Sequence, residues 1–256
     1  GHKIRGYNVN NTILKYNGVT NNTLITSNLL TDVLISDIRF DLGTNDDNLY
    51  SHINLYNTTN LIIKNCEFKN GYGSQLRLNG SSNVLIDNCY FYGVTGASGN
   101  PGEAIYCNGI TDLTIDKCKC VDIMDHFLYL DGSGDVNNVI VKNCDLQYTG
   151  KENILTNGGA IAIYGNCKDI FIKNNKISNC KVGINCAMRD DIYPHNIFIN
   201  DNNINNSDQD GIYIEVINSS ICNNFIYQNG QDGISIRKSS NINLNNNNCF
   251  ENGRCG

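Results

Sequence analysis

An eight-residue phrase returns along the chain, and this repetition restricts the fold more than any other feature. Residues 61–68 read LIIKNCEF and residues 84–91 read VLIDNCYF, with the same alternation, the same Asn-Cys pair and the same closing aromatic residue. Units of this kind recur every 22–31 residues, each opening on an Asn or Asp: Asp32, Asn60, Asn83, Asp112, Asn138, Asp169, Asn196, Asn218 and Asn241. A period of this length is typical of a solenoid, in which each unit stacks on the previous one.

Apolar and polar residues alternate inside each unit, which indicates β-strands. NVLID (83–87) shows this pattern for one strand, and GIYIE (211–215) shows it for a second strand of a unit. A short third strand such as EF (67–68) completes the unit, and nothing in it has the period of a helix. Parallel stacking of nine to ten such coils about 4.8 Å apart predicts a rod on the order of 40 Å long.

The chain contains 46 Asn and 12 Cys residues, and the repeat suggests a place for both. Asn tolerates the backbone conformation of tight bends, and its amide can hydrogen-bond to its counterparts in neighbouring coils. We expect such a ladder at one bend position: Asn65, Asn88, Asn143, Asn174, Asn223 and Asn246. A column of cysteines lies one residue later: Cys66, Cys89, Cys118 and Cys144. Their spacing is not that of a disulfide framework, so we interpret them as buried free thiols.

Composition argues against several partners. A formal net charge of −6 is unfavourable for binding nucleic acid or an anionic membrane surface. No apolar run approaches the roughly 18 residues that a membrane-spanning helix needs. The length of 256 residues suits one large domain, so we interpret residues 1–256 as a single unit. The chain begins inside a strand-like segment and stops at NGRCG without a closing element, so we expect it to be a fragment of a longer protein.

The units resemble those of right-handed parallel β-helix proteins of the pectin lyase-like superfamily. The resemblance lies in the pattern N-x-x-I-x-N-N-x-I followed by D-G-I-x-I, as in DNNINNSDQDGIYI (201–214) and NNFIYQNGQDGISI (223–236), and it extends over nearly the whole chain. It implies an all-β parallel solenoid. The superfamily contains pectate lyases, polygalacturonases, alginate lyases and epimerases, phage tailspikes and non-catalytic adhesins. The polygalacturonase pattern of N-T-D, D-D and R-I-K and the R-x-x-R-x-P segment of pectate lyases are absent, so no catalytic residue transfers from either family.

Long connections gather on both sides of one strand column, the one with the G-I-x-I pattern. Three connections that lead into this column exceed the usual 7–8 residues: Phe40 to Ile53, Phe91 to Ile105 and Leu146 to Ile161. On the other side of the column, the connections lengthen after Leu128 and after Ile184. Loops carry function in a repeat scaffold. We therefore expect a groove along this column, walled by loops, mostly in the first six coils.

The outer face of this column supplies candidate catalytic residues, namely Glu103, Asp125, His126 and Tyr129. The repeat places Glu103 and His126 next to each other on adjacent coils. Glu103 and Asp125 can serve as the acid and base of a glycosidase. Alternatively, His126 or Tyr129 takes a proton from a uronic acid in a β-elimination, with an arginine beside its carboxylate. A solvated outer face without a catalytic role is the competing interpretation.

Five further residues are expected to bind the substrate: Arg77, Tyr106, Asp131, Tyr164 and Arg189. Arg77, Tyr106 and Tyr129 occupy the same position in three successive coils, and Asp131 follows two residues after Tyr129. Such a row presents cations, hydroxyl groups and aromatic rings to a bound glycan.

Asp190 and Asp191 lie in the long loop AMRDDIYPHN (187–196) and make Ca²⁺ a candidate cofactor. A solvated acidic loop is the more frequent role of such a sequence. The Asp-Gly pairs at 210–211 and 232–233 are typical of turns.

Two classes of function are therefore open. The first is a polysaccharide lyase or glycosidase that acts on a glycan bound in the groove. The second is a non-catalytic rod of an adhesin or phage tailspike, which binds glycans or spaces other domains. Both imply a polysaccharide or cell-surface glycan as partner and a location outside the cell, on its surface or on a virion. The resemblance to tailspikes makes a trimer a candidate assembly.

Overall fold

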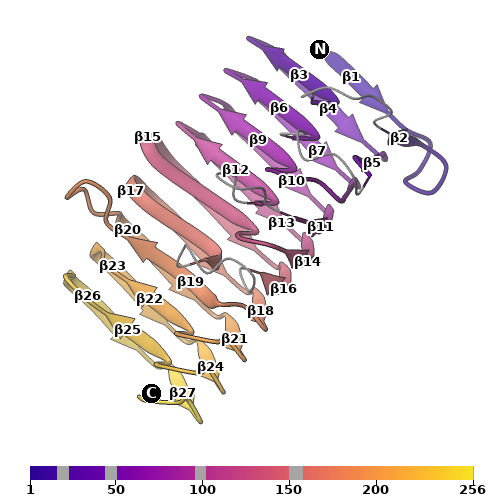
Figure 1. The fold of residues 1–256 in the computed structure, drawn as a ribbon. Coiled ribbons are helices and arrows are strands. Elements are labelled where there is room, and N and C mark those ends of the chain that lie inside the picture. Colours follow the sequence, from indigo (N-terminus) through magenta and orange to yellow (C-terminus); the bar gives the residue numbers. More distant parts are fainter. Residues whose placement is uncertain (16–22, 44–50, 96–101, 150–157, 256) are drawn as a thin grey trace.

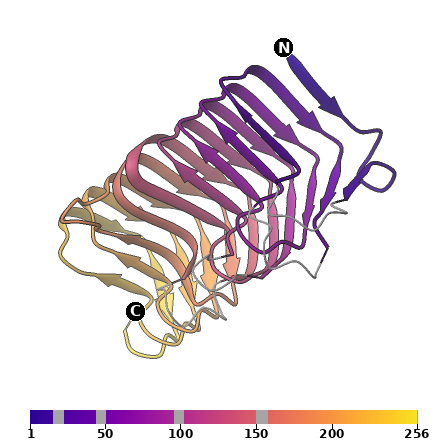
Figure 2. The same ribbon diagram turned by 45° about the horizontal axis from the view of Figure 1, so that its top comes forward.

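The chain folds into a parallel β-solenoid with three faces (Figure 1). The computed structural model describes residues 1–15, 23–43, 51–95, 102–149 and 158–255, and these segments contain strands but no helix. Successive coils stack side by side along one axis, so that the two termini lie at opposite ends (Figure 2). The all-β fold predicted from the repeat is confirmed.

The first face, here called the groove face, contains the G-I-x-I strands. Its strands are β3 (Ile25–Asn28), β6 (Ile53–Tyr56), β9 (Leu76–Asn79), β12 (Ile105–Asn108), the first part of β15 (Leu128–Lys142), the first part of β17 (Gly159–Lys173), β19 (Val182–Ala187), β22 (Ile212–Ile214) and β25 (Ile234–Ile236). Each strand pairs in parallel with the same position of the next coil, so that equivalent side chains form rows along the solenoid axis.

The second face contains the strands that open each repeat. They are β1 (His2–Arg5), β4 (Thr31–Ser36), β7 (Thr59–Lys64), β10 (Ser82–Asp87), β13 (Thr111–Asp116), the later parts of β15 and β17, β20 (His195–Asn200), β23 (Ile217–Cys222) and β26 (Ser240–Asn245). β15 and β17 run from the groove face into the second face without a break, which joins the two faces into one 17-stranded sheet.

The third face is a separate ten-stranded sheet of short strands. They are β2 (Ile13–Lys15), β5 (Arg39–Asp41), β8 (Glu67–Lys69), β11 (Tyr90–Val94), β14 (Lys119–Ile123), β16 (Asp145–Thr149), β18 (Lys176–Ser178), β21 (Asn203–Asn205), β24 (Phe225–Tyr227) and β27 (Asn248–Phe250). In the described segments, about eight turns separate the first complete coil from the last. These turns connect nine complete coils, the lower end of the nine to ten expected, and the first unit adds only β1 and β2.

The residues that open each repeat adopt the same backbone turn in every coil. The φ angles of these Asn and Asp residues, from Asp32 to Asn241, all lie between 51° and 56°. A second set of positive φ angles falls at the bend between the second and third faces, for example 52° at Asn65 and 50° at Asn88. Asn and Asp adopt this left-handed conformation more readily than other residues with a side chain, which accounts for the abundance of Asn.

The interior is a continuous apolar column in which residues of the same type stack on one another in successive coils. The rings of Phe40 and Phe68 stack at 5.1 Å, and those of Phe68 and Phe91 stack at 4.7 Å. Cys66, Cys89, Cys118 and Cys144 lie buried in one row beside them, and all twelve cysteines are free thiols. The expectation of buried thiols is therefore confirmed.

A buried asparagine ladder, which the sequence did not predict, lies one residue after the bend position. Asn175, Asn202, Asn224 and Asn247 continue the cysteine row, and the amide nitrogen of each donates a 3.0 Å hydrogen bond to the side-chain oxygen of the next. At the predicted bend position, the exposed Asn88 donates a 2.9 Å hydrogen bond to Asn65, which confirms the expected contact between these two residues. The bend residue points outward because its φ is positive, so the following residue points into the core.

Candidate functional site

The structure brings the nine predicted site residues to one region of the groove face. Parallel pairing aligns Arg77 on β9, Tyr106 on β12 and Tyr129 on β15, as the repeat predicts. Next to this row, the N–H of Ala104 donates a 2.8 Å hydrogen bond to the carbonyl of His126, which sets Glu103 and His126 on adjacent coils. The predicted register is thus confirmed, whereas the roles of these side chains are still predictions.

Glu103 lies two residues before β12, in the connection that enters the groove face, and it is buried, with only 4% of its surface exposed. The Ser74 hydroxyl on the preceding coil donates a 2.7 Å hydrogen bond to Glu103 Oε2. Burial raises the pKa of Glu103 to about 7, and the nearby Asp125 carboxylate adds to this, whereas the Ser74 bond opposes it. A carboxylic acid in this environment keeps its proton close to neutral pH.

Asp125 and His126 form a second buried unit beside Glu103. His126 Nε2 lies 3.4 Å from Asp125 Oδ1, and both residues are at most 3% exposed. The other ring nitrogen, Nδ1, lies 2.8 Å from the carbonyl oxygen and 3.1 Å from the backbone nitrogen of Gly159. The imidazole also stacks on the ring of Tyr129, with centroids 5.2 Å apart. Contacts on three sides therefore fix the orientation of His126.

Arg189 joins the tyrosines to Asp131. Its guanidinium forms an ion pair with Asp131, hydrogen-bonds to the Tyr129 hydroxyl, and lies 5.7 Å and 5.4 Å from the ring centroids of Tyr129 and Tyr164. The Tyr106 hydroxyl donates a 2.7 Å hydrogen bond to the second oxygen of Asp131. Asp131 is therefore held from two sides by groups that favour its charged form.

These contacts shift the pKa values of the cluster in opposite directions. Burial alone would raise the pKa of Asp131, but the hydrogen bonds from Tyr106 and Ser133 and the Arg189 charge lower it below its ordinary value. Burial and the bond to Asp131 raise the pKa of Tyr106 to about 12, and burial also raises the pKa of Tyr129. The tyrosines thus keep their protons at neutral pH, whereas Asp131 is ionised.

Arg77 lies at the edge of this cluster, with its guanidinium 4.3 Å above the ring centroid of Tyr106. A cation at this distance from an aromatic face is stabilised by the electrons of the ring. Arg77 covers the largely buried ring of Tyr106 and is itself partly exposed. The exposed part of Arg77 is suited to contact a sugar.

Two residues that contribute to the cluster were not predicted as site residues. Ser74 precedes Arg77 by three residues, and its sequence gives no indication of the bond to Glu103. Asn185 is buried and donates a 2.7 Å hydrogen bond to the Tyr164 hydroxyl. Asn185 lies on the outer side of β19, and Ser74 lies two residues before β9, at the position that Glu103 has before β12.

The candidate calcium ligands Asp190 and Asp191 form the tip of a tight turn. Arg189 and Ile192 bond to each other in an antiparallel bridge, and the two intervening aspartates have φ angles of 52° and 60°. This backbone conformation explains why Asp residues stand here. Among the residues that the structure describes, no three His, Cys, Asp or Glu side chains converge as metal ligands.

The loops expected to wall the groove lie partly outside the described residues. The three long connections contain residues 44–50, 96–101 and 150–157, for which the structure gives no description. The described part of the site consists of the groove strands and the hairpin that carries Arg189. The described segments also contain no helix long and apolar enough to cross a membrane.

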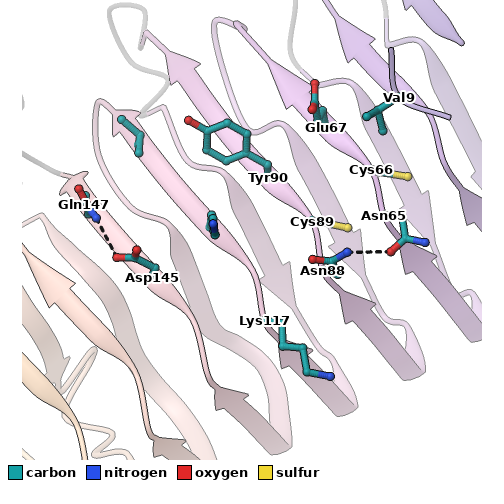
Figure 3. Close-up of a pocket in the computed structure, with 12 residues that line it drawn as sticks. Val9, Asn65, Cys66, Glu67, Asn88, Cys89, Tyr90, Lys117, Asp145 and Gln147 are labelled. Carbon is teal, nitrogen blue, oxygen red and sulfur yellow. Dashed lines mark hydrogen bonds between the residues drawn. The ribbon is translucent and has the colours of Figure 1, made fainter. Parts of the chain in front are cut away.

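A separate hollow of about 560 Å³ lies on the third face and is shown in Figure 3. Its two carboxylates, Glu67 on β8 and Asp145 on β16, are three coils apart, or roughly 14 Å. The carboxyl groups of a glycosidase lie only about 5–9.5 Å apart. Glu67 is moreover bound by Arg39 at 2.6 Å, and Asp145 accepts a 2.9 Å hydrogen bond from Gln147. This hollow therefore does not gather an acid and base pair.

Solved structures share the fold at low sequence identity. The surface protein and adhesin PfbA of Streptococcus pneumoniae is 15% identical, with a TM-score of 0.71 over 100% of this chain and 87% of that chain. An endo-xylogalacturonan hydrolase from Aspergillus tubingensis is 12% identical, with a TM-score of 0.62 over 99% and 86%. The periplasmic alginate epimerase AlgG is 14% identical, with a TM-score of 0.53 over 88% and 63%. These similarities include glycan-processing enzymes and an adhesin, so they establish the fold alone.

The comparison with curated proteins gives no match. A model of one protein family does match, described as the right handed beta helix region, over residues 1–148 and again over 103–256. The two matches together span the whole chain, in agreement with the stacked parallel strands and the resemblance noted in the sequence. This protein therefore belongs to the right-handed β-helix family.

Proposed function

We propose that this protein cleaves a polysaccharide bound along its groove face, with Glu103 donating a proton to the glycosidic oxygen. The observation that supports this most is the burial of Glu103, Asp125 and His126 together, just before the groove strands β12 and β15 begin. Neighbouring coils carry small or neutral residues at the position of Glu103 and His126: Ser51, Ser74, Gly159 and Val182.

Burying ionisable groups is costly, and a rod that only spaces other domains has no need of them. Strongly shifted carboxyl groups cluster where a reaction requires them. The third face offers a contrast, because the ion pair of Arg39 and Glu67 is partly exposed to solvent there. The site around Glu103 is therefore better explained by catalysis than by stability.

Hydrolysis fits these groups better than β-elimination. A pKa of about 7 lets Glu103 act as a general acid near neutral pH, and Asp125 supplies a second carboxyl group on the adjacent coil. A glycosidase needs two carboxyl groups close together, and the Asp125 carboxylate is near enough to Glu103 to raise its pKa. Elimination would use Tyr129 or His126 as the base. Burial raises the pKa of Tyr129, so its hydroxyl stays protonated and is a poor base at neutral pH. Both ring nitrogens of His126 already lie against Asp125 and the backbone of Gly159.

Arg77, Tyr106 and Arg189 then contact the bound chain. Arg77 lies over the ring of Tyr106 on one side of the acids, and Arg189 closes the other side together with Tyr164. The two guanidinium groups suit a glycan that contains acidic sugars, because arginine binds carboxylates through paired hydrogen bonds.

The test is a panel of acidic and neutral polysaccharides incubated with the wild type, Glu103→Gln and His126→Ala. New reducing ends without ultraviolet-absorbing products, lost in Glu103→Gln, identify a hydrolase. Ultraviolet-absorbing unsaturated uronates that are lost in His126→Ala and retained in Glu103→Gln identify a lyase instead. Binding of a glycan without cleavage would identify the alternative, a non-catalytic adhesin or tailspike rod.

A further inference from the structure

A second polar hollow lies on the groove face, towards the C-terminal end. Its volume is about 180 Å³, a size suited to a single sugar ring. Its lining comes from β19, β22 and the connections around them: Val182, Asn185, Gln209, Asp210, Tyr213, Gln231 and Arg237. Most of these side chains are polar, and they provide both hydrogen-bond donors and acceptors.

The side chains of this hollow repeat the chemistry of the first site. Arg237 places its guanidinium 5.6 Å from the ring centroid of Tyr213, as Arg77 does over Tyr106. The Tyr213 hydroxyl donates a 2.8 Å hydrogen bond to Glu215, two residues later, as Tyr106 donates to an aspartate. Asp210 is buried to 6% exposure and accepts a 3.0 Å bond from the Asp232 N–H.

Asn185 connects this hollow with the first site. It lines the hollow, and its amide also binds the hydroxyl of Tyr164, whose ring contacts both Tyr129 and Arg189. Tyr129 and Tyr213 occupy the same position of β15 and β22, three coils apart, which corresponds to roughly 14 Å along the solenoid axis. An extended glycan of several sugars is needed to reach from one site to the other.

We infer that this hollow is a second binding site for the same polysaccharide and that it holds a neutral sugar ring. This inference rests on the proposed function for the identity of its ligand. The hydroxyl groups of a sugar can donate to Asp210 and accept from Arg237 and the amides of Gln209 and Gln231. The carboxylate of Asp210, with that of Asp232 nearby, disfavours a uronate at this place. The enzyme therefore acts on long chains in preference to short fragments.

The first experiment measures binding in the absence of cleavage. In a Glu103→Gln background, affinity gel electrophoresis is run with two neutral polymers, xylan and α-1,3-glucan, and with two uronate polymers, alginate and polygalacturonate. We expect Arg237→Ala to weaken the binding of a neutral polymer about tenfold. Arg237 is exposed, so its replacement leaves the fold intact. Tyr213→Phe removes the hydroxyl and keeps the ring, and Tyr227→Ala on the third face is the control that retains full binding.

The outcomes separate this inference from the proposed function. Loss of neutral-polymer binding in Arg237→Ala supports the second site even if the wild type cleaves nothing, in which case the proposed function falls. Cleavage by the wild type with equal polymer affinity in Arg237→Ala and Tyr213→Phe overturns the second site and leaves the proposed function standing. No binding of any neutral polymer, or a loss confined to the uronate polymers, overturns it as well.

Discussion

Ser74 Oγ donates a 2.7 Å hydrogen bond to Glu103 Oε2 across adjacent coils. This bond favours the charged form of Glu103 and so lowers its pKa, which burial keeps near 7. Ser74→Ala should therefore raise the pKa of Glu103. Because the general acid acts in its protonated form, the alkaline limb of the pH profile of kcat/KM should move to higher pH. A limb that stays in place or moves to lower pH would contradict the assignment of Glu103.

The pH dependence of stability offers a test that needs no substrate. Glu103 has a pKa of about 7 in the folded state, against an ordinary value of 4.5. Its neutral form is favoured by folding, so its contribution is complete below pH 4.5 and is lost as the pH rises through 7. The shift corresponds to about 3 kcal/mol of unfolding free energy. Glu103→Gln should flatten the loss of stability between these pH values in urea titrations, whereas Glu67→Gln on the third face should retain it. Parallel curves for the wild type and Glu103→Gln would show that Glu103 is not strongly shifted.

The structural features that can be predicted from the sequence are those that recur with the period of the repeat. Alternation of apolar residues predicts which side of each strand faces inward, so the row of Arg77, Tyr106 and Tyr129 follows from counting residues. The repeat is sufficient to predict the fold, because each coil buries its apolar side chains against those of the next coil.

Other features depend on geometry that the repeat leaves undetermined. Asn174 and Asn175 are identical side chains, and only the positive φ of Asn174 decides that Asn175 enters the core ladder. Arg189 reaches Asp131 across 58 residues of sequence through a hairpin whose direction no pattern gives. The burial of Glu103 likewise arises from several elements at once.

Arg189 should contribute to substrate binding more than to stability. Its side chain is 32% exposed, and a partly exposed ion pair such as that with Asp131 stabilises a protein by about 1 kcal/mol or less. Arg189→Ala should raise KM about tenfold, the equivalent of roughly 1.4 kcal/mol. Arg189→Lys should restore only part of this, because lysine lacks the planar pair of donors. Arg39→Ala, which breaks the ion pair with Glu67 on the third face, is the matched control. Equal KM values for the two alanine variants would remove Arg189 from the substrate-binding set.

The buried ladder should make Asn202 important for folding. Its amide donates to Asn224 Oδ1 and to the carbonyl oxygens of Ile172 and Asn200, and its own oxygen accepts from Asn175. Asn202→Ala leaves buried backbone groups unpaired and should cost about 3 kcal/mol of unfolding free energy. Asn243, an exposed asparagine of β26, is the control, and Asn243→Ala should change stability by less than about 0.5 kcal/mol. Similar urea midpoints for both variants would contradict the role of the ladder.

Glu103 is proposed to act as the general acid of a glycan-cleaving site. The most direct measurement compares the release of reducing ends from the polysaccharide panel by the wild type, Glu103→Gln and Glu67→Gln. Loss of a general acid typically costs about 10²–10⁴-fold in rate. Glu103→Gln is expected to lose activity to this extent, and Glu67→Gln is expected to retain it. Equal release of reducing ends by the wild type and Glu103→Gln, or no release from any polymer of the panel, would contradict this assignment.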